Sequence, residues 1–185
     1  IMTNHHVIDN STEVRVIFED GRMYEANIIG SDRLTDIGLV KIVASNLIPI
    51  SIGNSDKMLV GDLAVAIGHP LTLGAAPTVT TGVVSALERR LDVGGDLMGS
   101  SVTLFGLIQT DAPITRGSSG GALINKNGEL IGITTAIATA DVGAEGLGFA
   151  VPINLALNIA EDLIKDGKIL HAFLGILGAQ HFDTA

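Results

Sequence analysis

The sequence is divided into many short runs of apolar and β-branched residues, separated by turn residues. Such runs are typical of β-strands joined by hairpins, because Gly supplies the positive φ that a tight turn needs. Residues 14–18 and 23–29 flank an Asp-Gly turn, and residues 122–124 and 130–136 flank an Asn-Gly turn. The pattern predicts two hairpins here and about ten strands in all.

One segment has a helical period. From Ile153 to Ile164, apolar residues recur at i, i+3, i+4, i+7 and i+11, and Gly167 is placed to end the helix. Residues 88–99 are charged and then Gly-rich, which predicts a long mobile loop. Further strands are predicted at residues 37–43, 63–67, 78–86, 102–110 and 147–151. Many strands and one late helix predict an all-β barrel or sandwich closed by a C-terminal helix.

Composition excludes several classes of protein. The chain has 185 residues, of which 46% are hydrophobic, so we expect a packed domain and not a disordered chain. A net charge of −9 makes nucleic acid an unfavourable partner. The absence of Cys excludes disulfides, a Cys-based zinc site and a thiol nucleophile. The sequence contains no nucleotide, flavin or metal motif, and we expect neither a cofactor nor a metal.

Residues 117–121, with the sequence Gly-Ser-Ser-Gly-Gly, are the sharpest local signal. A serine on a tight turn among glycines can expose its hydroxyl beside converging backbone N–H groups, although such runs also form plain turns. A nucleophilic serine needs a base, and the base needs an orienting group. Residues 3–7, Thr-Asn-His-His-Val, supply a histidine, and Asp36 opens a predicted buried strand.

Together these three segments resemble the HtrA (DegP-like) branch of the chymotrypsin-fold serine proteases. In that branch the histidine lies in TNxHV, the aspartate in SDIAL and the serine in RGNSGG. The order agrees, since Asp36 follows His6 by 30 positions and Ser119 follows Asp36 by 83. Further segments that look like this family are residues 66–70, 79–86, 109–112, 128–133 and 148–152. The resemblance therefore covers nearly the whole chain.

The resemblance implies an all-β, chymotrypsin-like double β-barrel with a C-terminal helix. It implies that Ser119 is the nucleophile, His6 the general base and then acid, and Asp36 the group that orients the imidazole. The backbone N–H groups of Gly117 and Ser119 would form the oxyanion hole. Arg116 lies on the loop that forms this hole, so the family implies activity gated by substrate.

Two positions have a neighbouring rival. Ser118 stands where the family usually has Asn, and it could be the nucleophile, but the GxSGG register favours Ser119. The TNxHV register favours His6 over His5 in the same way. Neighbours on an extended segment point to opposite sides, so only one histidine can face the serine, and a two-histidine metal site is disfavoured.

Gly38 stands where the family usually has Ala. The remaining histidines are interpreted as ordinary loop or surface residues: His69, His171 and His181.

The expected substrate pocket is small and apolar. Trypsin-like members with a basic preference carry a carboxylate six positions before the serine, where this chain has Pro113, whereas Asp111 lies eight before it. Cleavage is therefore predicted after Val, Ala, Ile or similar residues. The residues predicted to line the pocket are Ile114, Thr134, Thr135, Ala136 and Ile137.

We expect residues 1–167 to be a trypsin-like serine protease domain whose first barrel lacks its N-terminal strands. Residues 168–185 are expected to be a linker and the possible start of a PDZ domain, because residues 173–176 resemble a carboxylate-binding loop. The family implies an endopeptidase that degrades unfolded or misfolded proteins, forms homotrimers and works outside the cytoplasm, in the periplasm or cell envelope.

Three other functions are considered. One is a catalytically latent, protease-like module that binds polypeptides as a chaperone or scaffold. Another, a plain β-barrel binding domain, would require every motif match to be accidental. The nucleophile elbow of α/β-hydrolases is disfavoured because a predicted strand, and not a helix, follows Ser119.

Overall fold

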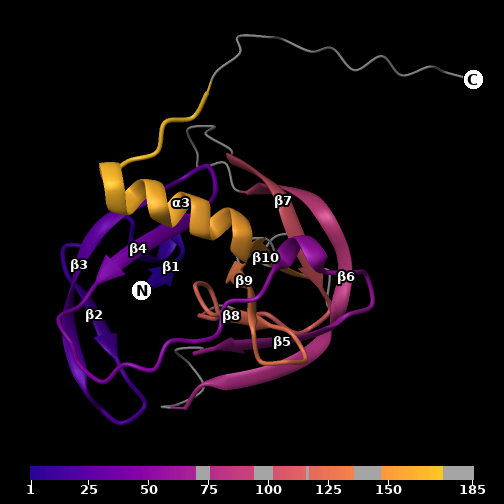
Figure 1. Cartoon of the computed structure of the whole chain (residues 1–185), viewed down its shortest axis with the longest axis horizontal. Helices are drawn as coiled ribbons and strands as arrows, with labels where there is room; N and C mark the ends of the chain where they lie inside the picture. The colour runs from indigo at the N-terminus through magenta and orange to yellow at the C-terminus, as the bar shows by residue number, and fades with distance from the viewer. Residues whose placement is uncertain (70–75, 94–101, 116, 136–146, 173–185) are drawn as a thin grey trace, which may run out of the picture.

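The computed structural model describes residues 1–69, 76–93, 102–115, 117–135 and 147–172. Two β-units lie next to each other, and one long helix runs across both (Figure 1). The N-terminal unit is an open sheet in the order β1-β4-β3-β2, with the one-turn helix α1 (His5–Ile8) after its first strand. Its strands are β1 (Met2–Thr3), β2 (Val14–Ile17), β3 (Met23–Asp32) and β4 (Ile37–Lys41).

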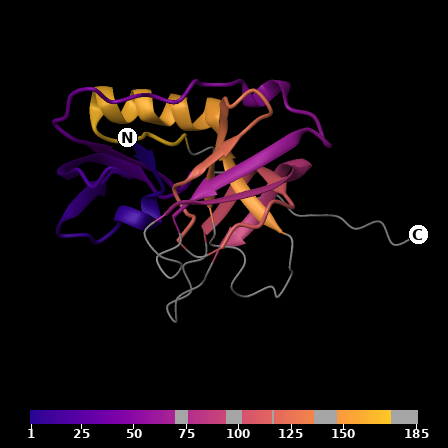
Figure 2. The same cartoon turned by 90° about the horizontal axis from the view of Figure 1, so that it is seen from below.

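The C-terminal unit is a closed barrel in the order β10-β7-β6-β5-β8-β9. All its neighbouring strands are antiparallel. In the orthogonal view, both units lie below the long C-terminal helix (Figure 2). The short 3-10 helix η1 (Ser55–Lys57) precedes the barrel. The barrel strands are β5 (Leu63–Gly68), β6 (Thr78–Val93), β7 (Val102–Thr110), β8 (Ala122–Ile124), β9 (Leu130–Thr135) and β10 (Gly148–Pro152). The chymotrypsin-like arrangement of two β-units and a C-terminal helix predicted above is confirmed.

Both predicted hairpins form. Strand β2 pairs with β3, and β8 pairs with β9, around turns in which Gly21 and Gly128 have φ of +84° and +75°. These values lie in the left-handed region, which Gly enters without the steric cost that other residues meet.

The predicted loop at residues 88–99 is wrong for its first half. Strand β6 continues to Val93 and pairs there with β7. Leu91 and Val93 are partly buried against the core, while Arg90 and Asp92 between and beside them are exposed. This alternation is that of a half-buried strand, and burial of the two apolar side chains favours the extended conformation. Residues 94–99 lie outside the described part of the chain.

The predicted helix is α3 (Ile153–Asp166), and it ends as expected at Gly167, whose φ is +70° and whose N–H donates to the carbonyl of Leu163 at 3.0 Å. Its buried face includes Ile153, Ala156 and Ala160, as predicted, but differs at the C-terminal end. Leu163 is fully buried, whereas Ile164, assigned to the apolar stripe, is 69% exposed. No helix among the described residues is long and apolar enough to cross a membrane.

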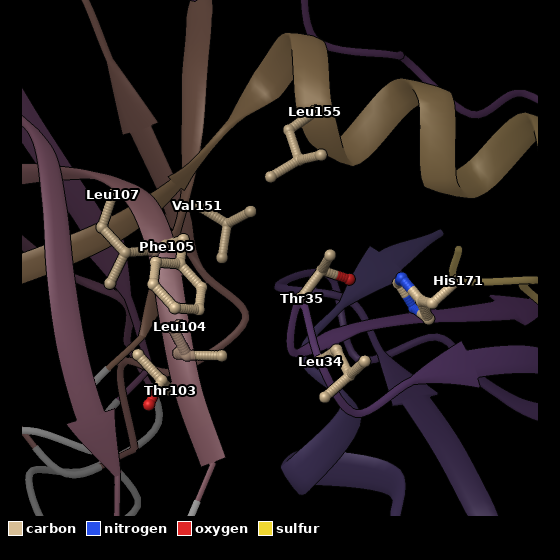
Figure 3. Close-up of a pocket in the computed structure, with 9 residues that line it drawn as sticks. All are labelled: Leu34, Thr35, Thr103, Leu104, Phe105, Leu107, Val151, Leu155 and His171. Atoms are coloured by element: carbon tan, nitrogen blue, oxygen red, sulfur yellow. The ribbon is translucent and has the colours of Figure 1, made fainter. Parts of the chain in front are cut away.

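Where the two units meet beside α3, a pocket of about 270 Å³ remains open (Figure 3). One wall is the turn between β3 and β4, with Leu34 and Thr35, and the opposite wall is β7. His171, five residues after the end of α3, also lines it.

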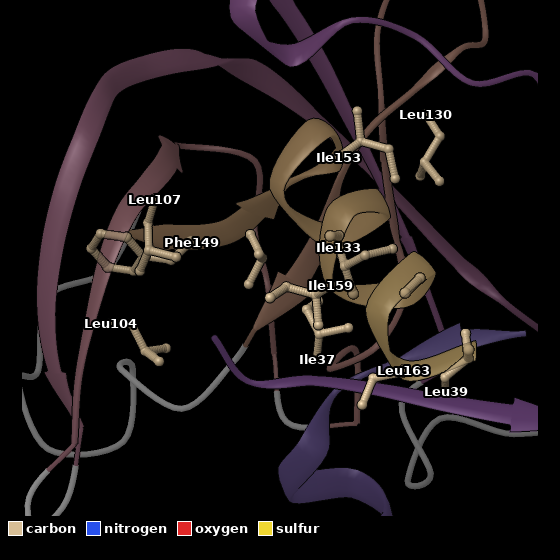
Figure 4. Packing of buried hydrophobic residues seen from close by; sticks show 13 residues of the cluster. Ile37, Leu39, Leu104, Leu107, Leu130, Ile133, Phe149, Ile153, Ile159 and Leu163 are labelled. Carbon is tan, nitrogen blue, oxygen red and sulfur yellow. The ribbon is translucent and has the colours of Figure 1, made fainter. Parts of the chain in front are cut away.

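The main hydrophobic core joins both units under α3. Ile37 and Leu39 of β4, barrel side chains such as Ile133, and helix residues such as Ile153 and Leu163 belong to one buried cluster (Figure 4). Ile37 is fully buried in this cluster. The residue directly before it, Asp36, is therefore held at the junction of the two units.

Candidate active site

Asp36 lies at the end of the β3–β4 turn, with 3% of its surface exposed. Its φ is +57°, in the left-handed region, which Asp adopts more readily than most residues other than Gly. Two donors hold the carbonyl of Asp36 in place, the backbone N–H of His5 at 3.1 Å and Nδ2 of Asn4 at 3.0 Å. The segment that carries the histidines therefore packs directly against the turn that carries the carboxylate.

His6 is paired with this carboxylate. Its Nδ1 lies 2.9 Å from both Oδ1 and Oδ2 of Asp36, and its backbone N–H donates to Oδ1 at 3.1 Å. An ionised carboxylate only accepts hydrogen bonds, so Nδ1 must carry the proton. In the neutral ring Nε2 is then the lone-pair nitrogen, which a general base needs.

His5 has a different partner. Its Nδ1 lies 2.8 Å from Oγ of Ser31. The two histidines lie on helix α1, so the predicted extended segment is wrong. Their side chains nevertheless have different partners, as expected. Within the described residues no three His, Cys, Asp or Glu side chains are grouped to hold a metal.

The loop with Ser118 and Ser119 is tied to β9. The hydroxyl of Thr134 donates to the carbonyl of Ser118 at 2.5 Å, and the N–H of Gly120 donates to the carbonyl of Thr134 at 2.9 Å. The N–H of Gly121 closes the turn onto the carbonyl of Ser118 at 3.1 Å. These bonds fix the backbone on both sides of Ser119.

Gly120 brings this loop against the histidine segment. Its φ is +79°, and a Cβ added there would clash with Oγ1 of Thr3 and lie 3.3 Å from the backbone nitrogen of Asn4. Only a residue without a side chain allows this approach. Ser119 directly precedes Gly120 in the sequence, so it is brought close in space to the segment that leads into His6.

The two serines differ in burial. Ser118 is 8% exposed, and its side chain lies so close to Gly68 of β5 that a Cβ at position 68 would be 2.8 Å from its Oγ. Ser119 is only partly buried. A nucleophile must be reached by substrate, so this difference favours Ser119.

Thr135 has a role that sequence reasoning missed. Its hydroxyl donates to Oδ2 of Asp36 at 3.1 Å, and its side chain is fully buried with Thr134. Ile114 is buried in the barrel core against Gly148. The assignment of these residues to a substrate pocket stays a prediction, and Ala136 and Ile137 lie outside the described residues.

The other predicted positions are placed as follows. Gly117 is exposed, with φ of +91°. His69 and His171 are both exposed, as expected, and Nε2 of His171 also lies 2.7 Å from Oδ1 of the buried Asp32. His181 and Arg116 lie outside the described residues. The oxyanion hole stays a prediction.

The trypsin-like peptidase domain family matches residues 1–133 of the sequence. The chain belongs to the trypsin-like peptidase family. This peptidase chain is 48% identical over 181 residues to the periplasmic pH-dependent serine endoprotease DegQ of Escherichia coli strain K12, and 45% identical over 181 residues to the periplasmic serine endoprotease DegP of the same strain. Each match covers 97% of the chain but 38% and 36% of the relatives, so the chain spans just over a third of their length.

Solved structures agree with the fold of this trypsin-like peptidase. The HtrA-type protease AlgW with decapeptide has a TM-score of 0.82 and 40% identity, covering 95% of this chain and 51% of its own. The serine endoprotease from Yersinia pestis has a TM-score of 0.78 and 41% identity, covering 96% of this chain and 58% of its own. The resemblance to HtrA (DegP-like) proteases predicted from the motifs is confirmed.

Proposed function

We propose that the protein is a serine endopeptidase in which Ser119, His6 and Asp36 form the catalytic triad. The observation that carries the proposal is the pairing of His6 Nδ1 with both oxygens of the buried Asp36 at 2.9 Å. This pairing selects the tautomer whose Nε2 can take a proton, and the anion stabilises the imidazolium that results.

The reaction proceeds through an acyl-enzyme. Oγ of Ser119 attacks the scissile carbonyl carbon while Nε2 of His6 takes the hydroxyl proton. The tetrahedral intermediate collapses as the imidazolium gives this proton to the leaving amine. A water molecule, activated by His6 in the same way, then attacks the ester and releases the carboxylate product with Ser119 regenerated.

The oxyanion of the tetrahedral intermediate is assigned to the N–H groups of Gly117 and Ser119. Loss of one such donor typically costs about 10²–10³ in kcat, or roughly 3–4 kcal/mol of barrier. The bonds from Thr134 and Gly120 support this assignment because they fix the backbone that carries the donors.

The substrates proposed are unfolded or misfolded polypeptides, cleaved after small or medium apolar residues. The protein would act outside the cytoplasm, in the periplasm or cell envelope, as a homo-oligomer of the trimeric type. Support comes from similarity to DegQ and DegP, which are named periplasmic serine endoproteases.

The test is hydrolysis of a peptide series that differs only at P1, with an unfolded protein as a second substrate. We expect turnover with Val, Ala or Ile at P1, none with Ser119→Ala, and near-natural turnover with Ser118→Ala. Equal turnover after Lys or Arg would contradict the pocket. Binding of unfolded protein without any hydrolysis would support the latent chaperone or scaffold instead.

A further inference from the structure

A buried carboxylate, Asp32, holds the turn that leads into Asp36. Asp32 ends β3 and is 6% exposed. Its Oδ2 accepts hydrogen bonds from the backbone N–H of Thr35 at 3.0 Å and from the Thr35 hydroxyl at 2.6 Å. Its Oδ1 lies 2.7 Å from Nε2 of His171. These contacts satisfy a carboxylate that burial would otherwise disfavour, and the mechanism above uses none of them.

Packing does not fix this turn on the side that faces β7. Leu34 is 49% exposed, and with Thr35 it lines the pocket of about 270 Å³ (Figure 3). Close packing against neighbouring atoms holds residues in place in a protein interior. On the side of the turn that faces the pocket, such neighbouring atoms are missing. The hydrogen bonds to Asp32 are therefore a restraint on this part of the turn.

Asp36 needs such a restraint. Asp tolerates the left-handed conformation better than most residues, but it is still a sparsely populated conformation that the surrounding contacts hold in place. Asn4 and His5 hold the carbonyl of Asp36 on one side. The bonds between Asp32 and Thr35 hold the residue directly before Asp36 on the other side.

We propose that Asp32 is a positioning residue for Asp36, and that His171 ties the chain leaving helix α3 to the same turn. The inference rests on the proposed function, because the position of Asp36 matters for catalysis only if the triad operates. Thr35 and His171 lie on the same side of the pocket in Figure 3, and both bond to the one carboxylate. A displacement of His171 would therefore alter the hydrogen bonding of Asp32, which holds the turn that carries Asp36.

Variants at Asp32 separate positioning from a merely structural role in the natural full-length protein. Asp32→Ala removes all three contacts. We expect the fluorophosphonate labelling rate at Ser119 and kcat for peptide hydrolysis to fall about tenfold or more, with KM within about twofold, because a misplacement of about 1 Å can cost about a hundredfold. Asp32→Asn keeps an acceptor oxygen for Thr35, so we expect it to restore most of both rates.

Variants at His171 test the second part of the proposal. His171→Ala removes the donor to Asp32 and is expected to slow labelling about threefold, since the bonds from Thr35 remain. His171→Gln keeps an N–H donor within reach of Oδ1 and is expected to restore the rate. Equal labelling by His171→Ala and the natural protein would overturn the tie between this segment and the turn.

The control is Asp62→Ala. The Oδ2 of Asp62 also holds a turn, accepting the N–H of Leu59 at 2.9 Å, but it lies before β5, at the opposite end of that strand from Gly68 and Ser118. It is expected to lose stability without losing the labelling rate. A folded Asp32→Ala protein that labels at the natural rate, or no more slowly than Asp62→Ala, overturns the positioning role while the proposed function stands.

Two measurements cover the remaining outcomes. If Asp32→Ala does not fold, Thr35→Val takes its place, because it removes only the hydrogen bond from the Thr35 hydroxyl to Asp32. Its labelling rate is then compared with that of Asp62→Ala. If the natural protein does not label at Ser119, the proposed function fails. The NMR resonance of the His6 Nδ1 proton then decides: its loss in Asp32→Ala supports the positioning role, and an unchanged resonance overturns it.

Discussion

Thr135→Val tests how the triad carboxylate is held. Val has nearly the shape of Thr but has no hydroxyl, so it removes the bond to Oδ2 of Asp36 at 3.1 Å. Asp36 is 3% exposed, and water cannot readily replace the lost donor. Hydrogen bonds to charged groups are worth about 1.5–3 kcal/mol, and we expect the free energy of unfolding to fall by about this amount.

The expected effect on the reaction comes from the position of Asp36, because a bond that is equally strong in the free enzyme and in the transition state does not change kcat/KM. A misplacement of about 1 Å can cost about a hundredfold, so we expect kcat/KM to fall about tenfold or more when Asp36 loses this donor. The assays are urea unfolding and peptide hydrolysis. In the Asp36→Asn background the charged acceptor is gone, so the effect of Thr135→Val on stability should shrink by about 1 kcal/mol or more.

Ser55→Ala is the matched control. The Oγ of Ser55 is also buried, accepting the N–H of Asn154 at 3.1 Å, but it joins η1 to α3, and neither element carries a triad residue. We expect a loss of about 0.5–1.5 kcal/mol in stability and kcat/KM within about twofold of the natural value. Natural activity in Thr135→Val would contradict this role of the hydroxyl, and so would an equal loss of stability from Thr135→Val in the natural protein and in the Asp36→Asn background.

Two further predictions concern the serine loop and the core. Gly120→Ala places a Cβ against Oγ1 of Thr3 at a φ of +79°, so we expect labelling of Ser119 to slow at least about tenfold. Gly128→Ala is its control, since φ is +75° but no atom lies within 4 Å; equal labelling by the two would contradict the close approach. Leu163→Ala should lower the free energy of unfolding by about 2–5 kcal/mol, whereas the exposed Ile164→Ala should change it by less than about 0.5 kcal/mol in urea melts. The reverse order would place the wrong face of α3 in the core.

Features that depend on neighbouring residues could be predicted from the sequence. The Asp-Gly and Asn-Gly turns, the period of α3 and the stop at Gly167 are local, and each forms as expected. The resemblance to the HtrA family, which rests on several motifs along the chain, implies that Asp36 orients His6, and the two side chains are paired in the structure. The catalytic roles of the two residues stay a prediction.

Features that depend on distant residues were missed. The hydroxyl of Thr135 reaches a carboxylate 99 positions away, and His171 reaches one 139 positions away. No local pattern marks either pair. The predicted strand at residues 78–86 is too short for a similar reason. The last residues of β6, which include the charged Arg90 and Asp92, are extended because they pair with β7.

The central claim is that Ser119 is an activated nucleophile. The most direct measurement is covalent labelling by a fluorophosphonate, read by mass spectrometry on the natural protein and on Ser119→Ala, with His6→Ala and Ser118→Ala alongside. The account predicts one label at Ser119, its loss in Ser119→Ala and His6→Ala, and its retention in Ser118→Ala. Labelling of Ser118, or no labelling of a protein shown to be folded, would contradict it.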